Sequence, residues 1–220
     1  KLTMLVMWFA PLAVFAAVSA AVAKSGLGIL AVYGTFMMEF YFAILVLWLV
    51  LFAAAWGVIG RRAIKLFRAV REPVVLAFAT ASSEAAYPRT LAQLERFGCS
   101  NRVASFVLPL GYSFNLDGSM MYCTFAVMFI AQAYGIELTL AQQLTMLLTL
   151  MVTSKGMAGV PRASLVVIAA TLSQFNIPEA GLLLLLGVDH FLDMARSATN
   201  VVGNSVATAV VSKWEGQLRE

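Results

Sequence analysis

The segment GVDHFLDMARSATNVVGN, residues 187–204, decides the fold because it places ionisable and amide side chains inside an apolar stretch. At about 100° per residue, its polar residues share one helical arc roughly 100° wide. They are Asp189, Asp193, Arg196, Ser197, Asn200 and Asn204. The other faces carry Leu, Phe, Val, Met and Ala, which suit an apolar surround. Ionisable groups at membrane depth are costly and mark a substrate or ion path, so this segment predicts a helix with a buried functional stripe.

The composition predicts an integral membrane protein. The 220 residues are 61% hydrophobic and 12% charged, whereas a soluble domain carries about 25% charged residues. The net charge of +4 does not indicate nucleic acid, because the basic residues cluster as a membrane topology requires. Five of them follow a long apolar run: Arg61, Arg62, Lys65, Arg68 and Arg71. The positive-inside rule places this cluster in the cytoplasm; a patch for lipid head groups is the alternative, on the same side.

Residues 1–72 are expected to form two transmembrane helices and a cytoplasmic basic loop. The spans are Thr3–Ala23 and Ile29–Gly60, and the second is too long for one straight crossing unless it is tilted. It contains Glu39, which we interpret as an interfacial or packing residue rather than a functional one. Because the chain begins at Lys1 directly before an apolar span, we expect it to be the C-terminal part of a longer protein.

Residues 73–220 divide into four apolar segments, most of them interrupted by polar residues. They are a re-entrant hairpin at 73–98, a broken helix at 103–133, a second hairpin at 140–177 and the stripe-bearing helix at 178–212. Non-helical backbone at membrane depth is tolerated only where it is buried in protein or lines a cavity. One hairpin entering from each side, with a broken helix between them, is typical of an inverted repeat with a binding site at the membrane midplane.

Four strings carry a family resemblance: SSE at 82–84, LPLGYSFNLDGS at 108–119, TSKGMAGVP at 153–161, and the opening segment at 187–204. In these four strings the chain resembles the dicarboxylate/amino acid:cation symporters, which are the glutamate transporter family. Within that family its sequence is most similar to the bacterial proton/glutamate–aspartate symporters. The resemblance implies an all-α elevator fold in which 73–220 is the core transport domain. It also implies a homotrimer in the lipid bilayer of the bacterial inner membrane, multi-pass, with a cytoplasmic C-terminus.

The resemblance assigns roles to matching positions. Substrate would be bound by Ser82, Ser83, Ser119, Val160, Asp193, Arg196, Ser197 and Asn200, with Arg196 holding a side-chain carboxylate and Asp193 an α-ammonium group. A coupling cation would be bound by Gly111, Asn115, Asp117, Asn200 and Asn204. The outer gate would be formed by Gly156, Met157, Ala158, Gly159 and Pro161. The implied activity is symport of glutamate or aspartate into the cell, with no cofactor and no enzymatic step.

Three positions depart from the family pattern, and two of them, Asn204 and Cys123, bear on coupling. Asn204 stands where many sodium-coupled members have Asp, and an amide is a weaker ligand for a hard cation. This favours H⁺ over Na⁺ as the coupling ion, although Asn115 and Asp117 could still form a sodium site. Cys123 stands where potassium-exchanging members carry Glu, and Arg162 where many relatives have Gly.

The sequence is also compatible with other roles for several of these residues. Asp193 and Arg196 could form only an internal i,i+3 ion pair, and Ser82 or Ser83 could cap a helix. His190 could carry the coupling proton or be a packed residue, and Asp193 and Glu84 are other proton candidates. C4-dicarboxylate symport and sodium-coupled symport are alternatives within the family.

Two other classes of function are an intramembrane hydrolase and a channel. An intramembrane hydrolase would use Ser82 or Ser113 as nucleophile with Lys155 or His190 as base, but no Gly-x-Ser-x-Gly motif frames either serine. A channel would not accumulate its substrate against a gradient. Both hypotheses explain the sequence less well than the hypothesis of a symporter does.

Overall fold

The computed structural model describes residues 12, 15–16, 18–20, 22–23, 26–157 and 163–219, and in this part of the chain the regular structure is helical. Most of the first expected span, Thr3–Ala23, lies outside the described residues. The long helices are α2 (Gly28–Ile59), α5 (Ser83–Phe97), α6 (Asn101–Phe114), α7 (Asp117–Ala133), α8 (Leu140–Thr153) and α11 (Asp189–Trp214). The shorter ones are α3 (Arg62–Ala69), α4 (Arg71–Thr80), η1 (Ser154–Gly156), α9 (Ser164–Gln174), η2 (Glu179–Gly181) and α10 (Leu182–Leu185).

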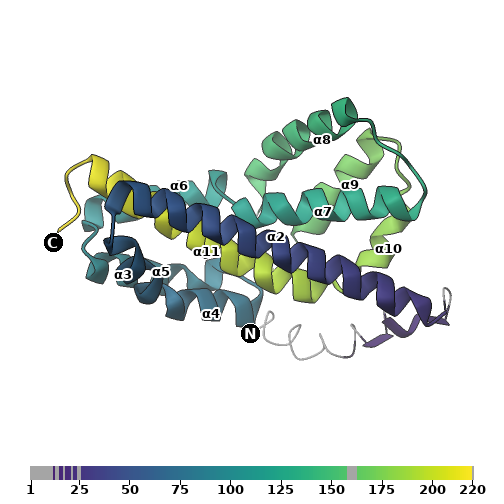
Figure 1. Ribbon diagram of the computed structural model, residues 1–220, viewed down its shortest axis with the longest axis horizontal. Helices are drawn as coiled ribbons and strands as arrows, with labels where there is room; N and C mark the ends of the chain where they lie inside the picture. The colour runs from purple at the N-terminus through teal and green to yellow at the C-terminus, as the bar shows by residue number, and fades with distance from the viewer. Residues whose placement is uncertain are drawn as a thin grey trace.

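Helix α11 is the centre of the fold. It runs beside α2 along the long axis of the molecule, with α3, α4 and α5 toward one end and α8, α9 and α10 toward the other (Figure 1). Helices α2, α4, α5, α6 and α7 all pack against it. Most of its apolar residues, such as Leu192 and Val201, are buried in protein like its polar ones, whereas Phe191 and Trp214 are exposed.

Helix α2 is one unbroken rod. Its 32 residues give a length of about 48 Å, which exceeds a hydrocarbon core of about 30 Å and so favours a tilted crossing. Large apolar side chains such as Phe42 and Leu49 are exposed along it. Within the described residues, α2 and the stretch Asn101–Ala133 are long and apolar enough to cross a membrane.

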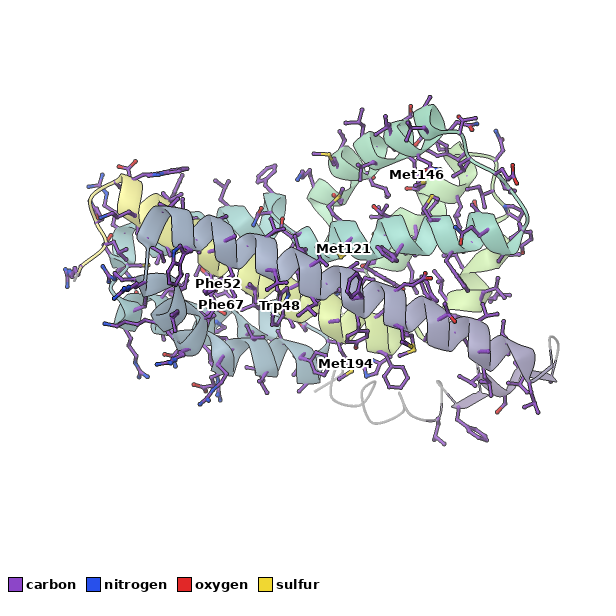
Figure 2. The ribbon with its side chains drawn as sticks, in the orientation of Figure 1. Trp48, Phe52, Phe67, Met121, Met146 and Met194 are labelled. Atoms are coloured by element: carbon purple, nitrogen blue, oxygen red, sulfur yellow. The ribbon has the colours of Figure 1, made fainter. Side chains whose placement is uncertain are left out.

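The basic segment after α2 is helical rather than the expected loop. Helix α3 buries Ala63 and Leu66 and leaves Lys65 and Arg68 exposed, so its amphipathic pattern stabilises it against the protein. Phe67 from this helix packs edge-on against Phe52 of α2 with ring centroids 5.2 Å apart (Figure 2).

The segment predicted as the first hairpin forms two helices that meet at a polar turn. The turn lies between α4 and α5, where Ala81 has φ 47° and Ser82 is extended. The Ser82 hydroxyl oxygen accepts a hydrogen bond from the Ala85 amide at 3.3 Å, so the capping role allowed from the sequence is confirmed.

The predicted break in the long helix at 103–133 is also confirmed. Asn115 (φ −122°, ψ 62°) and Leu116 (φ −99°, ψ 67°) leave helical geometry between α6 and α7. A helix end leaves carbonyl groups without intrahelical partners. One of them, the Phe114 carbonyl, accepts a hydrogen bond from the Lys155 ammonium at 2.6 Å.

The last segment is not the single helix expected over 178–212. It contains η2, α10 and a turn at 186–188 before α11 begins at Asp189. Gly187 lies in this turn, where an added Cβ would come within 3.4 Å of the Tyr33 ring of α2. The close approach of α2 is a tertiary effect, and the surrounding run of leucines suits a helix equally well, so the sequence gives no signal for the break.

Candidate functional site

The Asn200 side chain, in the stripe of α11, forms hydrogen bonds with the first turn of α7. Its side-chain oxygen accepts hydrogen bonds from the amides of Gly118 at 3.0 Å and Ser119 at 3.3 Å. Its side-chain nitrogen donates to the Ser119 hydroxyl oxygen at 3.0 Å. The first amides of a helix have no intrahelical partner, so Asn200 caps α7 from a helix that lies 80 residues further along the chain.

Arg196 is a fully buried cation with protein partners on two helices. It forms an ion pair with Asp193, one turn earlier on α11. Its guanidinium also donates to the hydroxyl oxygens of Ser119 at 3.2 Å and Ser197 at 3.5 Å. Burial of a charge is tolerated when it is paired and hydrogen-bonded. The internal ion pair considered from the sequence is therefore present, and it is compatible with a ligand role because a guanidinium carries five N–H donors.

The residues predicted to bind a cation converge where α6 and α7 meet α11. The Asn115 amide nitrogen donates to Asn204 Oδ1 at 3.3 Å and to Asp117 Oδ2 at 3.4 Å. Gly111 lies against the Asn204 side chain and Gly203 against the Asp117 carboxylate, so closely that a Cβ at either position would overlap them. Around the Asn115 amide nitrogen the chain thus brings together one carboxylate oxygen and one amide oxygen, from Asp117 and Asn204, and these are ligand types that hard cations prefer.

A cavity of about 530 Å³ opens beside these residues. Asn115, Asp117, Thr124 and Lys155 contribute its polar lining, and the rest is apolar. Among the residues that the structure describes, no group of three His, Cys, Asp or Glu side chains could hold a metal ion. A sodium ion here would therefore depend on amide and carbonyl oxygens around the single carboxylate of Asp117.

Gly118 allows the backbones of α7 and α11 to touch at this site. A Cβ added to it would overlap the Arg196 carbonyl oxygen and lie 2.9 Å from Cβ of Thr199. We expect Gly118→Ala to lower the free energy of unfolding by about 1–3 kcal/mol, because backbone atoms cannot yield as side chains do. Thermal unfolding in detergent measures the change. Gly34→Ala on α2 is the matched control: its Cβ meets nothing within 4 Å, so stability should be unchanged or slightly raised, and equal melting of both variants would contradict the packing argument.

The tip of the first hairpin lies against the other side of α11. Ser83 is buried, and its carbonyl accepts a hydrogen bond from the Tyr112 hydroxyl at 2.9 Å. Ala77 and Ala86 from the two arms pack together with Val201. Ser82 and Ser83 lie at the turn between these two arms, and their role in substrate binding stays a prediction.

The second hairpin is described only in part. Gly156 ends the short helix η1, and Met157, the next gate residue, is buried. The other predicted gate residues Ala158, Gly159 and Pro161, the predicted substrate residue Val160, and Arg162 lie outside the described residues.

Two contacts of the stripe had no role in the sequence interpretation. The Tyr122 hydroxyl donates to the buried Asp189 carboxylate at 2.5 Å. The Trp48 indole nitrogen donates to the Thr199 hydroxyl oxygen at 2.9 Å and so links α2 to α11. Asp189 belongs to the stripe seen in the sequence and Thr199 does not, and nothing in the sequence identifies Tyr122 as the partner of Asp189 or Trp48 as the partner of Thr199.

The remaining candidates are less central. His190 is half-buried at the start of α11, with its ring 6.2 Å from that of Phe191, and Glu84 is exposed. The Ser113 hydroxyl donates to the Pro109 carbonyl at 3.3 Å, and Lys155 donates to a backbone carbonyl rather than to a serine. The pairing of Ser113 with Lys155 that a hydrolase would need is thus not formed.

The sequence of the chain is similar to that of a family of transporters and of several named relatives. The sequence model that describes the sodium:dicarboxylate symporter family matches residues 1–214 of this chain. The chain is 46% identical over 215 residues to the proton/glutamate-aspartate symporter of Escherichia coli (strain K12), covering 98% of the chain and 49% of the relative. It is 45% identical over 223 residues to the proton/sodium-glutamate symport protein of Bacillus caldotenax, covering 98% and 51%.

A further relative is the C4-dicarboxylate transport protein of Cupriavidus taiwanensis, 45% identical over 210 residues and covering 95% of the chain and 48% of the relative. The chain thus spans about half the length of the curated relatives it matches. Since the family model extends over nearly all of its residues, the chain belongs to the sodium:dicarboxylate symporter family of membrane transporters.

Proposed function

We propose that this chain is the transport half of a secondary active transporter that carries glutamate or aspartate into the cell together with protons. The observation that carries the proposal is the buried Asp193–Arg196 pair, surrounded by the hydroxyl groups of Ser119 and Ser197. It places a cation and an anion one helical turn apart. The relatives named for glutamate or aspartate symport support the same substrate class.

Each charge of the pair suits one group of an acidic amino acid. The planar guanidinium of Arg196 can hold the side-chain carboxylate through two parallel hydrogen bonds. The Asp193 carboxylate can hold the α-ammonium group. Asn200, together with Ser82 and Ser83 at the hairpin tip, would offer hydrogen bonds to the α-carboxylate.

Symport of C4-dicarboxylates is the second candidate, because a relative named for that transport is as similar to the chain as the glutamate symporters are. Asp193 argues against it. A dicarboxylate has no ammonium group, and a buried carboxylate beside its second carboxylate would repel it. Symport of an acidic amino acid therefore fits the site better than symport of a C4-dicarboxylate.

H⁺ is proposed as the coupling ion because the side chain of Asn204 is an amide and not a carboxylate. This residue is buried and accepts a hydrogen bond from Asn115 through its amide oxygen. An amide has no negative charge to compensate a sodium ion. A sodium site built on Asn115 and Asp117, with Gly111 and Asn200 nearby, is the alternative.

The wider architecture follows from the same proposal. Residues 73–220 would form the moving domain of an elevator, with two re-entrant hairpins entering from opposite sides and residues 156–161 as the outer gate. Residues 1–72 would supply two transmembrane helices. The whole protein would be a homotrimer of the bacterial inner membrane with a cytoplasmic C-terminus, which the basic residues 61–71 support.

The test is uptake of L-aspartate and L-glutamate by the full-length transporter in proteoliposomes with an inward proton gradient and no sodium. We expect accumulation above equilibrium that a protonophore abolishes. Succinate at tenfold excess should compete poorly. Uptake that begins only when sodium is added would contradict the assignment from Asn204, and preferential uptake of succinate would contradict the amino acid assignment.

A further inference from the structure

Lys155 is a cation placed deep in the second hairpin. It is the one basic residue between Arg102 and Arg162. In the proposed re-entrant hairpin it follows Leu140, the first residue of α8, by 15 residues, or about 22 Å along the helix. A hydrocarbon core is about 30 Å thick, so Lys155 lies inside it whether the arm is upright or tilted. A charged group at this depth is costly and by default indicates function.

The Lys155 ammonium group is held at the break between α6 and α7. It donates a hydrogen bond to the Phe114 carbonyl oxygen at 2.6 Å, across 41 residues of sequence. Phe114 is the last residue of α6, and the C-terminus of a helix carries roughly half a negative elementary charge. The neighbouring Ser154 hydroxyl donates to the Met120 sulfur at 3.0 Å. The end of the α8 arm is therefore fastened to both halves of the broken helix (Figure 1).

The cavity of about 530 Å³ at this break has one carboxylate and one ammonium group among the described residues that line it. Asp117 supplies the carboxylate and Lys155 the ammonium group, and the two charges attract each other. The attraction is strong because the remaining walls are mostly apolar and keep the local dielectric low. Lys155 therefore balances the negative charge that would otherwise make this cavity attractive for a metal cation.

A sodium ion would compete with this ammonium group for the same partners. Hard cations take carboxylate and carbonyl oxygens as ligands, and here these are Asp117 and the end of α6. The ammonium group is a compact point charge of the same size as that of sodium, and its three N–H donors are directed at oxygen atoms. Because it is covalently attached, it is present without any ion being taken from solution, and it repels a second cation.

From this placement we propose that Lys155 is a tethered cation that takes over the electrostatic role of a sodium ion at the break between α6 and α7. Its ammonium group compensates Asp117 and the end of α6, and it holds the second hairpin on the broken helix without a bound metal ion. The inference rests on the proposed proton symport and deepens it by naming the residue that makes sodium unnecessary. It is separate from the argument on Asn204, which concerns a weaker ligand and not a resident charge.

The test measures binding of labelled glutamate to the purified full-length transporter at constant pH, in sodium chloride and in choline chloride of equal concentration. The wild type should bind equally in both salts. In choline we expect Lys155→Met to bind about tenfold more weakly or worse, because the uncompensated Asp117 repels an anionic substrate and a charge-assisted hydrogen bond is lost. Sodium should restore its affinity to within about threefold of the wild type. Sodium should also raise the melting temperature of Lys155→Met, and not that of the wild type.

Two further variants separate the charge of Lys155 from its hydrogen bond. Lys155→Arg keeps the charge and should bind glutamate without sodium, whereas Lys155→Gln keeps N–H donors without the charge and should need sodium. Lys213→Met is the matched control, because it neutralises an exposed lysine in the last turn of α11 that does not line the cavity. Its glutamate affinity should equal that of the wild type in both salts.

Wild-type affinity of Lys155→Met in choline would overturn the role of Lys155 while leaving proton symport intact. Weak binding by a folded Lys155→Met that sodium does not restore would overturn it as well, because the lysine would then act only in packing. Should Lys155→Met not fold in either salt, Lys155→Gln carries the same test with the same two outcomes. A wild type that binds glutamate only in sodium would overturn the proton symport and the role of Lys155 together.

Discussion

Arg196→Ala should abolish high-affinity binding of glutamate and aspartate. The side chain is fully buried and would hold the substrate carboxylate by two charge-assisted hydrogen bonds, each worth about 1.5–3 kcal/mol. Their loss corresponds to a decrease in affinity of about two to four orders of magnitude. Binding of radiolabelled glutamate to the purified full-length transporter measures it, and neutral amino acids such as serine should compete better than they do in the wild type.

The variant also leaves Asp193 buried without the guanidinium, which alone can destabilise a protein by about 3–5 kcal/mol. The double variant Arg196→Ala with Asp193→Asn removes both charges and keeps the comparison interpretable if the single variant unfolds. Arg68→Ala, on the exposed face of α3, controls for the loss of a positive charge and should bind glutamate normally. Unchanged glutamate affinity in a folded Arg196→Ala protein would show that another group binds the carboxylate.

Asp193→Ser should turn an amino acid transporter into one that prefers dicarboxylates. Removal of the carboxylate takes away the partner of the α-ammonium group and leaves Arg196 to bind a second carboxylate. Loss of one partner of a buried charge pair typically costs about 2–5 kcal/mol, so the ratio of glutamate to succinate affinity should fall by about 30-fold or more. Competition of succinate against labelled glutamate, and direct succinate uptake, measure the change.

Asp193→Asn provides the conservative comparison, since it keeps the volume of the side chain and loses only its charge. It should shift selectivity in the same direction as Asp193→Ser. If both variants retain the selectivity of the wild type, Asp193 serves only as the structural partner of Arg196, and the amine-binding assignment is wrong.

The sequence predicted the parts of the site that depend on local pattern. Helical periodicity placed Asp193, Arg196 and Asn200 on one arc, and the structure buries all three. The polar residues at 115–119 marked the break in the long helix, because an apolar span has no other use for Asn, Asp and Gly together. The serine cap of α5 was likewise readable, since it depends on residues three apart.

The sequence could not predict contacts that arise only when distant helices meet. The hydrogen bond from Tyr122 to Asp189 and the fit of Gly118 against the Arg196 carbonyl join α7 to α11 across more than 60 residues. The turn at 186–188 interrupts a run of leucines whose pattern suits a helix equally well.

The attachment of α2 to α11 has a practical consequence for observing motion. Two hydrogen bonds fasten these helices: Tyr41 donates to the Phe191 carbonyl at 2.7 Å, and Trp48 donates to Thr199 at 2.9 Å. They lie seven residues apart on α2, about 10 Å along its axis, so sliding one helix past the other by a turn would break both. A spectroscopic label at the exposed Met38 would therefore report the displacement of α11 without a change to α11 itself.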